Sequence, residues 1–215
     1  MEALRDAIRG HRSLLEDGKI LHRDVSENNI IIIELLAEGA PKGRLIDLDL
    51  AKELDSMPSG ARHRTGTMQF MAIEVLEGKG HTYRHDLESF FYVFVWMCIR
   101  YGYKGTGKQK PIKVPKTNIL RGWYTGMYTE IARNKVGDMG KNRFENIIVE
   151  FAPEFENLKP LARELRSTLF PIRDGDIFTG TFHDRDIMYD GVIDAFSRAI
   201  DRLGEEQQAR RRLGS

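Results

Sequence analysis

The spacing of apolar residues divides the chain into a front helix, two short strands and a long helical second half. Leucine and isoleucine recur at helical spacing over residues 3–16, and Asp17-Gly18 follows as a helix stop. Two apolar stretches, 29–36 and 43–51, flank the turn-rich string AEGAPKG. This pattern predicts a β-hairpin or two neighbouring strands.

The remainder of the chain is predicted to be one long loop followed mainly by helices. Residues 52–67 are polar and rich in Gly, Pro, Ser and Arg, which is typical of a long, mobile loop. A second loop of mixed glycine and lysine is expected over residues 101–115. Helical spacing then predicts helices at 86–100, 119–134, 143–150, 158–169 and 189–203.

The string FFYVFVWMCI, residues 90–99, is apolar all round but too short to cross a bilayer. It is therefore expected to form a helix buried on every side. The N-terminal segment has no apolar region of the kind found in secretory signals. A single cysteine, Cys98, excludes an intramolecular disulfide and a cysteine-based zinc site. We therefore expect an intracellular protein of the cytoplasm or nucleus.

Composition and net charge say little about the class of binding partner. The 215 residues are 41% hydrophobic and 30% charged, as in an ordinary globular protein. A net charge of +1 gives no reason to expect nucleic acid or an anionic membrane as a partner. The basic cluster 210–212 is expected to be solvated as part of a polar tail, residues 206–215.

Three oxygen-bearing side chains stand at the ends of the predicted strands. Asp24 and Asn29 lie in HRDVSENN, just before the first strand, and Asp47 opens DLDLA at the end of the second. An aspartate on such a loop can accept a proton from a hydroxyl. An amide oxygen and a carboxylate at adjacent strand ends can share Mg²⁺. Phosphoryl transfer needs such positioning together with neutralisation of charge by metal ions.

Together with later motifs, these residues resemble a protein kinase. HRDVSENN matches the catalytic-loop pattern H-R-D-x-x-x-x-N, and DLDLA stands where D-F-G stands. GTMQFMAIE, residues 66–74, looks like the end of an activation segment, and HDLESFFYVF resembles the buried central helix of the large lobe. Further details are similar to the fungal-type protein kinase family. They are Ser26, Asp49, the Asp-Leu-Glu-Ser string and RGWYTGMYTEIARNK. The resemblance extends over residues 4–203.

The resemblance implies an α+β, mainly α fold: a kinase-like C-terminal lobe in which a small β-hairpin lies next to the catalytic loop, beside a helical bundle. This lobe would occupy residues 1–205. Its landmarks would be the catalytic loop (20–33), the metal motif (47–49), the activation segment (47–74) and the central helix (86–100).

The resemblance also assigns roles to individual residues. Asp24, within His22-Arg23-Asp24, would be the catalytic base, and Thr67 would bond toward it, as in serine/threonine kinases. Asn29 and Asp47 would bind ATP and Mg²⁺, with Ser26 also beside the nucleotide. Asp86 would brace the backbone of the His-Arg-Asp turn. Glu74 is expected to pair with an arginine, for which Arg173 is a candidate.

The chain departs from the common kinase pattern in three places. Ser26 and Asn28 stand where most protein kinases carry Lys or Arg near the γ-phosphate, and Asp49 replaces a glycine. Only 21 residues precede His22, and they contain no glycine-rich loop or strand lysine. The small N-terminal lobe is therefore expected to be absent. The surface it would cover should be exposed and apolar, so a missing N-lobe or a dimer partner is a candidate partner besides ATP and a protein substrate.

Several alternatives remain open. Asp24, Asn29 and Asp47 are also ordinary turn formers, and Thr67 could simply cap a helix. Arg23 could hold a phosphate on the activation segment or only pack locally. The lobe could be a pseudokinase that serves as an interaction module. It could also be a small-molecule phosphotransferase of the aminoglycoside or choline type, although those enzymes lack a segment like GTMQFMAIE.

Overall fold

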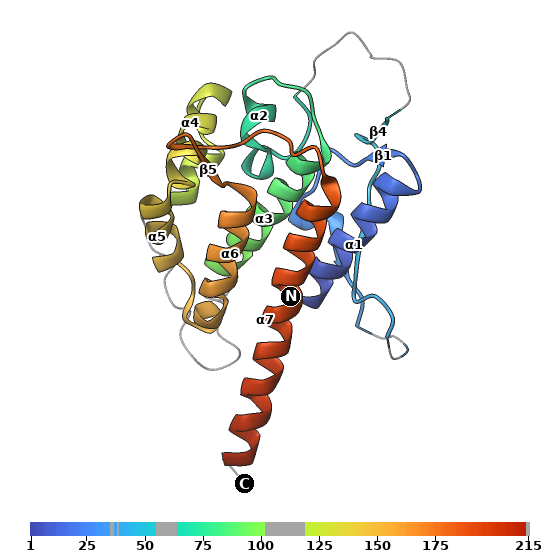
Figure 1. Ribbon diagram of the computed structural model, residues 1–215, viewed down its shortest axis with the longest axis vertical. Helices are drawn as coiled ribbons and strands as arrows, with labels where there is room; N and C mark the ends of the chain where they lie inside the picture. The colour runs from blue at the N-terminus through green and yellow to red at the C-terminus, as the bar shows by residue number, and fades with distance from the viewer. Residues whose placement is uncertain (35–36, 38, 55–63, 102–118, 214–215) are drawn as a thin grey trace.

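Helices make up most of the structure, a computed structural model that describes residues 1–34, 37, 39–54, 64–101 and 119–213. Figure 1 shows α3 in the middle, α4 and α5 on one side, and α1 with the first strands on the opposite side. The α-helices of the described part are α1 (Glu2–Glu16), α2 (Ile73–Leu76), α3 (Tyr83–Arg100), α4 (Tyr128–Asp138), α5 (Lys141–Val149), α6 (Lys159–Leu169) and α7 (Arg185–Leu213). Short 3₁₀ helices are η1 (Glu27–Asn29), η2 (Met68–Phe70), η3 (Ile119–Trp123) and η4 (Pro153–Leu158).

The strands of the described part form three separate antiparallel pairs. The pair β2–β3 is the hairpin expected beside the catalytic loop, with Ile31 opposite Arg44. The other pairs join β1 to β4 and β5 to β6. The strands are β1 (Ile20–Leu21), β2 (Ile30–Ile32), β3 (Gly43–Leu45), β4 (Lys52–Glu53), β5 (Ile172–Arg173) and β6 (Asp176–Ile177). A mainly helical α+β fold is therefore confirmed.

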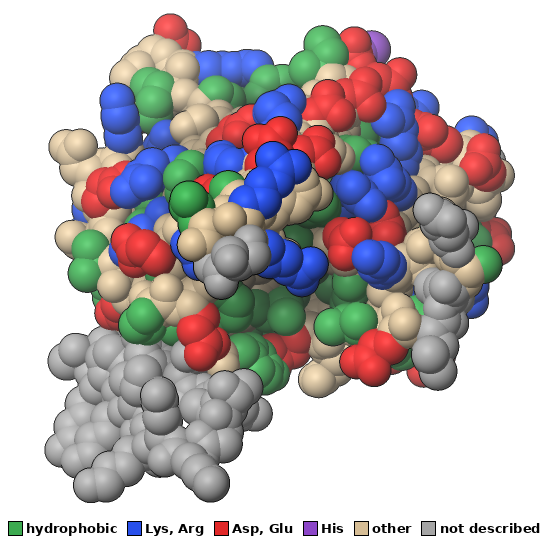
Figure 2. Space-filling model, turned by 90° about the horizontal axis from the view of Figure 1, so that it is seen from below, with side chains coloured by type: hydrophobic (Ala, Val, Ile, Leu, Met, Phe, Trp, Pro, Cys, Tyr) green, Lys and Arg blue, Asp and Glu red, His purple; other side chains and the backbone are tan. Residues whose placement is uncertain are grey.

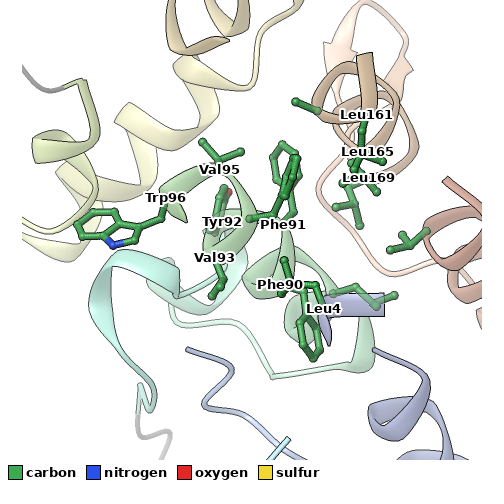
Figure 3. Close-up of a cluster of buried hydrophobic side chains, with 14 of the residues drawn as sticks. Leu4, Phe90, Phe91, Tyr92, Val93, Val95, Trp96, Leu161, Leu165 and Leu169 are labelled. Atoms are coloured by element: carbon green, nitrogen blue, oxygen red, sulfur yellow. The ribbon is translucent and has the colours of Figure 1, made fainter. Parts of the chain in front are cut away.

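The apolar run 90–99 lies inside α3, as expected, and α3 is the centre of the core. Its side chains are buried around the whole circumference, so neighbouring elements must cover it on all sides. Figure 3 shows Phe90, Phe91 and Tyr92 of this helix in the same cluster as Leu4 of α1 and Leu165 of α6. The helix begins at a capping box in which Thr82 and His85 satisfy each other's backbone N–H groups.

Two predicted elements have different boundaries in the structure. The helix expected over 119–134 is split into η3 and α4. Gly126 has a φ of 110° between them, a left-handed value that interrupts a helix. The loop expected over 52–67 begins with strand β4, which pairs with β1, and its residues 55–63 lie outside the described part. Most of the loop expected at 101–115 lies outside it as well.

The last helix is longer than its apolar pattern indicates. It was expected to end at residue 203, but α7 continues to Leu213 and projects beyond the body in Figure 1. The basic cluster Arg210-Arg211-Arg212 therefore lies in its last turn, where positive charge favours the helix dipole. Figure 2 views the molecule from this end and shows acidic and basic side chains interspersed over the face. Within the described residues, no helix is both long and apolar enough to cross a membrane.

Candidate active site

His22 fixes the start of the catalytic loop from a fully buried position. The backbone N–H of Asp24 donates to its Nδ1 at 3.3 Å, and its Nε2 lies 2.9 Å from the carbonyl oxygen of Ile46. Because Nδ1 accepts, Nε2 carries the proton and donates to Ile46. The ring therefore joins the loop before β2 to the residue that follows β3.

The backbone of Arg23 is held in a left-handed conformation by Asp86. Arg23 has a φ of 71°, which is costly for a residue with a side chain. Its N–H lies 3.2 Å from both carboxylate oxygens of Asp86, which lies in the first turn of α3. The expected bracing of the His-Arg-Asp turn by Asp86 is therefore present. The Nε of Arg23 is buried without a hydrogen-bond partner in the described part of the chain.

Both carboxylate oxygens of Asp24 are oriented by neighbouring residues. Oδ1 accepts from the backbone N–H of Thr67 at 2.8 Å and from its hydroxyl at 2.9 Å. Oδ2 lies 3.3 Å from Nδ2 of Asn29, a weaker contact. Two elements separated by the whole hairpin thus converge on one carboxylate, and Oδ2 keeps capacity to accept another proton donor.

Asn29 links Asp24 to the end of β3. Its Nδ2 donates to the carbonyl oxygen of Asp24 at 2.8 Å, and its own carbonyl accepts the N–H of Ile46 at 2.9 Å. Because the amide nitrogen faces Asp24, Oδ1 is left as an acceptor. Among the residues that the structure describes, no donor bonds this Oδ1. Asn29 and Ile46 together therefore set the place of the next residue, Asp47.

Asp47 is exposed and has a φ of 67°. Its Oδ1 accepts the backbone N–H of Asp49 at 3.1 Å, which forms a tight local turn. This bond favours a fixed loop around Asp49, the residue that replaces a glycine, and leaves Oδ2 of Asp47 for another ligand. The hard oxygens of Asn29 and Asp47 fit Mg²⁺ in kind. In the described ranges, no cluster of three or more His, Cys, Asp or Glu is arranged as a metal site.

Ser26 is placed differently from what its predicted contact with the nucleotide suggests. It is 2% exposed and precedes η1, where its carbonyl accepts the N–H of Asn29 at 3.2 Å. The neighbouring Asn28 is exposed. The observed contact of Ser26 is therefore structural, and its role toward the nucleotide stays a prediction.

Gly66 allows the later segment to approach the catalytic loop. Its φ is 112°, and a Cβ built there would lie 3.0 Å from the carbonyl oxygen of Arg23. A side chain would both strain the backbone and crowd the loop. The glycine before Thr67 thus permits the contact that Thr67 makes with Asp24.

The end of this segment is anchored on α3. The N–H of Ile73 donates to Glu88 at 2.8 Å, and Glu88 also pairs with the buried Arg84. The predicted pairing of Glu74 with Arg173 is wrong. Glu74 instead contacts Lys79 at 2.8 Å and His85 at 3.2 Å, both close to it in sequence.

Arg173 is placed elsewhere by aromatic side chains. Its guanidinium lies 3.7 Å from the ring centroid of Phe178 and 4.7 Å from that of Phe182. Planar guanidinium groups stack well on aromatic faces. Lys79 takes the role expected of an arginine because it lies in the turn directly after α2.

Sequence reasoning missed two further partners of Asp86. His11 and His81 each place Nε2 2.8 Å from one of its carboxylate oxygens. Burial by itself raises the pKa of Asp86, but His81 and His11 outweigh it and hold that pKa well below its usual range. The histidine at position 11 could have been found by its place on the apolar face of the predicted front helix.

One family model matches the first part of the chain. Residues 1–98 match the family model of the fungal protein kinases. This match confirms, for that stretch, the resemblance inferred from the motifs. It covers the catalytic loop, the Asp47 turn, the segment that carries Thr67 and most of α3.

Curated kinases are also similar to part of this chain. Inhibitor of nuclear factor kappa-B kinase subunit alpha of Danio rerio is 40% identical over 76 residues, 35% of this chain and 10% of that protein. The probable serine/threonine-protein kinase gdt4 of Dictyostelium discoideum is 28% identical over 109 residues, 51% of this chain and 6% of that protein. The chain thus matches only a small part of the length of these relatives.

Proposed function

We propose that the chain is the C-terminal lobe of a protein kinase that transfers the γ-phosphate of ATP to serine or threonine hydroxyls. The observation that carries this proposal is the convergence on Asp24. Thr67 binds Oδ1 through its N–H and its hydroxyl, and Asn29 approaches Oδ2. Turn formation alone does not explain why a threonine from a distant segment fixes this carboxylate.

The chemistry assigned to Asp24 is that of a general base. Oδ2 would accept the proton of the substrate hydroxyl as its oxygen attacks the γ-phosphorus of ATP. The bond between the γ-phosphorus and the bridging oxygen breaks, and ADP leaves with that oxygen. Because Thr67 occupies Oδ1, the carboxylate cannot turn away from the substrate.

The residues of this chain also account for how a metal would be held. When bound, Mg²⁺ would neutralise charge on the phosphates, with Asn29 and Asp47 as the ligands that the donor chemistry favours. The hydrogen bonds of Ile46 to His22 and Asn29 hold the backbone next to Asp47 against the catalytic loop. This arrangement supports assigning Asp47 to the same site as Asn29.

The apolar surface beside the site supports a covering partner. Ile32, the last residue of β2, is 65% exposed, and Leu48, directly after Asp47, is 48% exposed. A small N-terminal lobe or a second copy of the chain would bury such side chains. Light scattering over increasing concentration tests the second possibility, and a monomer at all concentrations would contradict it.

The proposal is tested by phosphate transfer in the natural polypeptide that contains residues 1–215. Asp24→Asn and Asp47→Ala should each reduce incorporation into protein by a factor of about 10² or more. Asp194→Asn is the matched control, since Asp194 is exposed on α7, and should leave the rate unchanged. Incorporation that survives both site substitutions would refute the assignment.

Calorimetry with Mg²⁺-ATP separates the proposal from its alternatives. Nucleotide binding without transfer to any acceptor would identify a pseudokinase. No binding at millimolar nucleotide would identify an interaction module. Transfer to small alcohols but not to proteins would identify a small-molecule phosphotransferase instead.

A further inference from the structure

Lys135, on α4, is fully buried and bonds the backbone of the segment that carries Thr67. Its Nζ donates to the carbonyl oxygen of Gln69 at 2.9 Å and to that of Met71 at 2.6 Å. Both acceptors lie where η2 ends and the chain becomes extended. Such carbonyls lack the regular partners of a helix or a strand, so a side-chain donor must satisfy them when they are buried.

Aromatic rings complete the surroundings of this ammonium group. The Nζ of Lys135 lies 4.1 Å from the ring centroid of Tyr92 and 5.6 Å from that of Trp123. The indole is itself fixed, because its Nε1 donates to Asp138 at 2.8 Å. Rings at this distance attract a cation through their electron-rich faces.

The Tyr92 ring connects Lys135 to the other anchor of the same segment. Its hydroxyl donates to Oε1 of Glu88 at 2.7 Å, and that oxygen also accepts the N–H of Ile73 at 2.8 Å. The two ends of the stretch from Gln69 to Ile73 are therefore held by one buried polar network. A lysine that served only to fill space would be replaceable by methionine at no cost to this segment.

Burial of a lysine is expensive, which makes a purely incidental position a poor explanation. Burial lowers the pKa of Lys135 to about 7, against a partly compensating attraction from Glu88. Two carbonyl acceptors and two rings offset part of that cost. The donor groups toward Gln69 and Met71 remain available in the charged and in the neutral amine.

Other contacts of α4 reinforce the same attachment. Ile131 and Ala132 form a small separate core with Met71, Ala72, Val75 and Leu76. The guanidinium of Arg64 lies 4.8 Å from the ring centroid of Tyr128 at the start of α4. The chain before Thr67, through Arg64, and the chain after it, from Met71 onward, therefore both contact α4.

We propose that Lys135 is a positioning residue that holds residues 67–76 on α4 and thereby keeps Thr67 in place against Asp24. The consequence for phosphoryl transfer rests on the function proposed above. The attachment itself does not, because it is a property of the folded chain. Lys135 would thus act on the carboxylate through the backbone of another segment.

Hydrogen exchange of the wild-type chain and of Lys135→Met and Lys135→Gln variants tests the attachment. Met and Gln have nearly the same length and shape, but only Gln keeps N–H donors. Loss of the donors should speed exchange of the Phe70 and Met71 amides by roughly tenfold to a hundredfold in Lys135→Met. Lys135→Gln should recover part of that protection, while α6 amides stay unchanged in both variants.

Lys141→Met, at the exposed first residue of α5, is the control and should exchange like the wild type. Equal exchange in wild type and Lys135→Met would overturn the proposal. Equal acceleration in the Met and Gln variants would also overturn it, because packing alone would then explain the effect. These measurements need no catalysis, so failure of the kinase assignment leaves them decisive.

If neither variant folds, wild-type exchange still decides. The amides of Phe70 and Met71 should then open at rates within about tenfold of the α4 amides, since the two are attached. Opening more than a hundredfold faster than α4 would overturn the proposal. In an active polypeptide, Lys135→Met should lower kcat and leave the KM for ATP unchanged, and an unchanged kcat would show that Lys135 does not act on the site.

Discussion

Nε2 of His11 lies 2.8 Å from a carboxylate oxygen of Asp86, and both side chains are completely buried. The other ring nitrogen of His11 is hydrogen-bonded to the hydroxyl of Tyr189 at 2.7 Å. Asp86 also accepts the N–H of Arg23. One line of contacts therefore runs from α7 through α1 to the turn that precedes Asp24, so the catalytic loop is supported by both ends of the described chain.

Asp86→Asn should destabilise the fold strongly. Asparagine keeps the shape of the carboxylate, but its NH₂ group would face the donors that now bond Asp86. Those buried donors would lose their acceptor. We expect a loss of about 3 kcal/mol in the free energy of unfolding, measured by urea denaturation at pH 7. Asp194→Asn should change it by less than about 0.5 kcal/mol. A similar stability of both variants would contradict the importance of this carboxylate.

The same carboxylate predicts acid sensitivity. Although burial opposes it, the pKa of Asp86 is lowered from 3.8 by His81 and His11. A carboxyl whose folded pKa is depressed stabilises the fold above its unfolded pKa and loses that contribution as pH falls below it. Unfolding free energy should therefore drop between pH 4 and about pH 2. The drop should be smaller in Asp86→Asn, and an identical pH profile would contradict the prediction.

Gly66→Ala should destabilise the fold, whereas Gly10→Ala should stabilise it. The positive φ of Gly66 and its closeness to Arg23 predict a loss of about 1 to 3 kcal/mol. Gly10 lies within α1 with no atom within 4 Å of an added Cβ, so alanine there should stabilise by about 0.5 to 1 kcal/mol. Thermal unfolding of both variants measures this difference, and the same sign for both would be evidence against it.

The hydroxyl of Thr67 should matter for transfer more than for stability. Thr67→Val removes the bond to Oδ1 of Asp24 but keeps the shape and the backbone N–H bond. We expect a fall in kcat of roughly tenfold to a hundredfold, and near wild-type activity in Thr67→Ser. Equal activity of the Val and Ser variants would show that the hydroxyl is not used.

Lys135 predicts a rise in stability with pH. Its pKa is about 7 in the folded protein against 10.5 ordinarily, so above pH 7 the unfolded chain binds the extra proton. The free energy of unfolding should therefore increase with pH, by up to about 1.4 kcal/mol per pH unit from this group. Urea denaturation between pH 7 and 8.5 should show this rise in the wild type and a smaller one in Lys135→Met. Equal slopes would mean that the pKa is not lowered.

Much of the site could be predicted because its signals lie in short local strings. His22, Asp24 and Asn29 occur within eight consecutive residues, and the hairpin follows from two apolar stretches around a turn. The bond between Thr67 and Asp24 was expected from the kinase-like spacing, and the structure contains it. Their roles in catalysis remain predictions.

The rest depended on contacts that no local pattern contains. Lys135 looks like a solvated lysine at the end of an ordinary helix, and its acceptors lie 64 and 66 residues earlier in the chain. Glu74 was assigned a distant arginine when a lysine in the next turn was closer. The break at Gly126 was missed because apolar residues continue on both sides of it.

The backbone of Ile46 binds the catalytic loop through both its N–H and its carbonyl group, so β3 and the loop share a single alignment. Side chains alternate between the faces of a strand, and deleting one residue from 43–45 would turn Asp47 to the opposite side. Extra residues next to Gly39, which is open to solvent, would leave that alignment intact. Related chains should therefore vary in length in the turn between β2 and β3, while the distance from Gly43 to Asp47 stays constant.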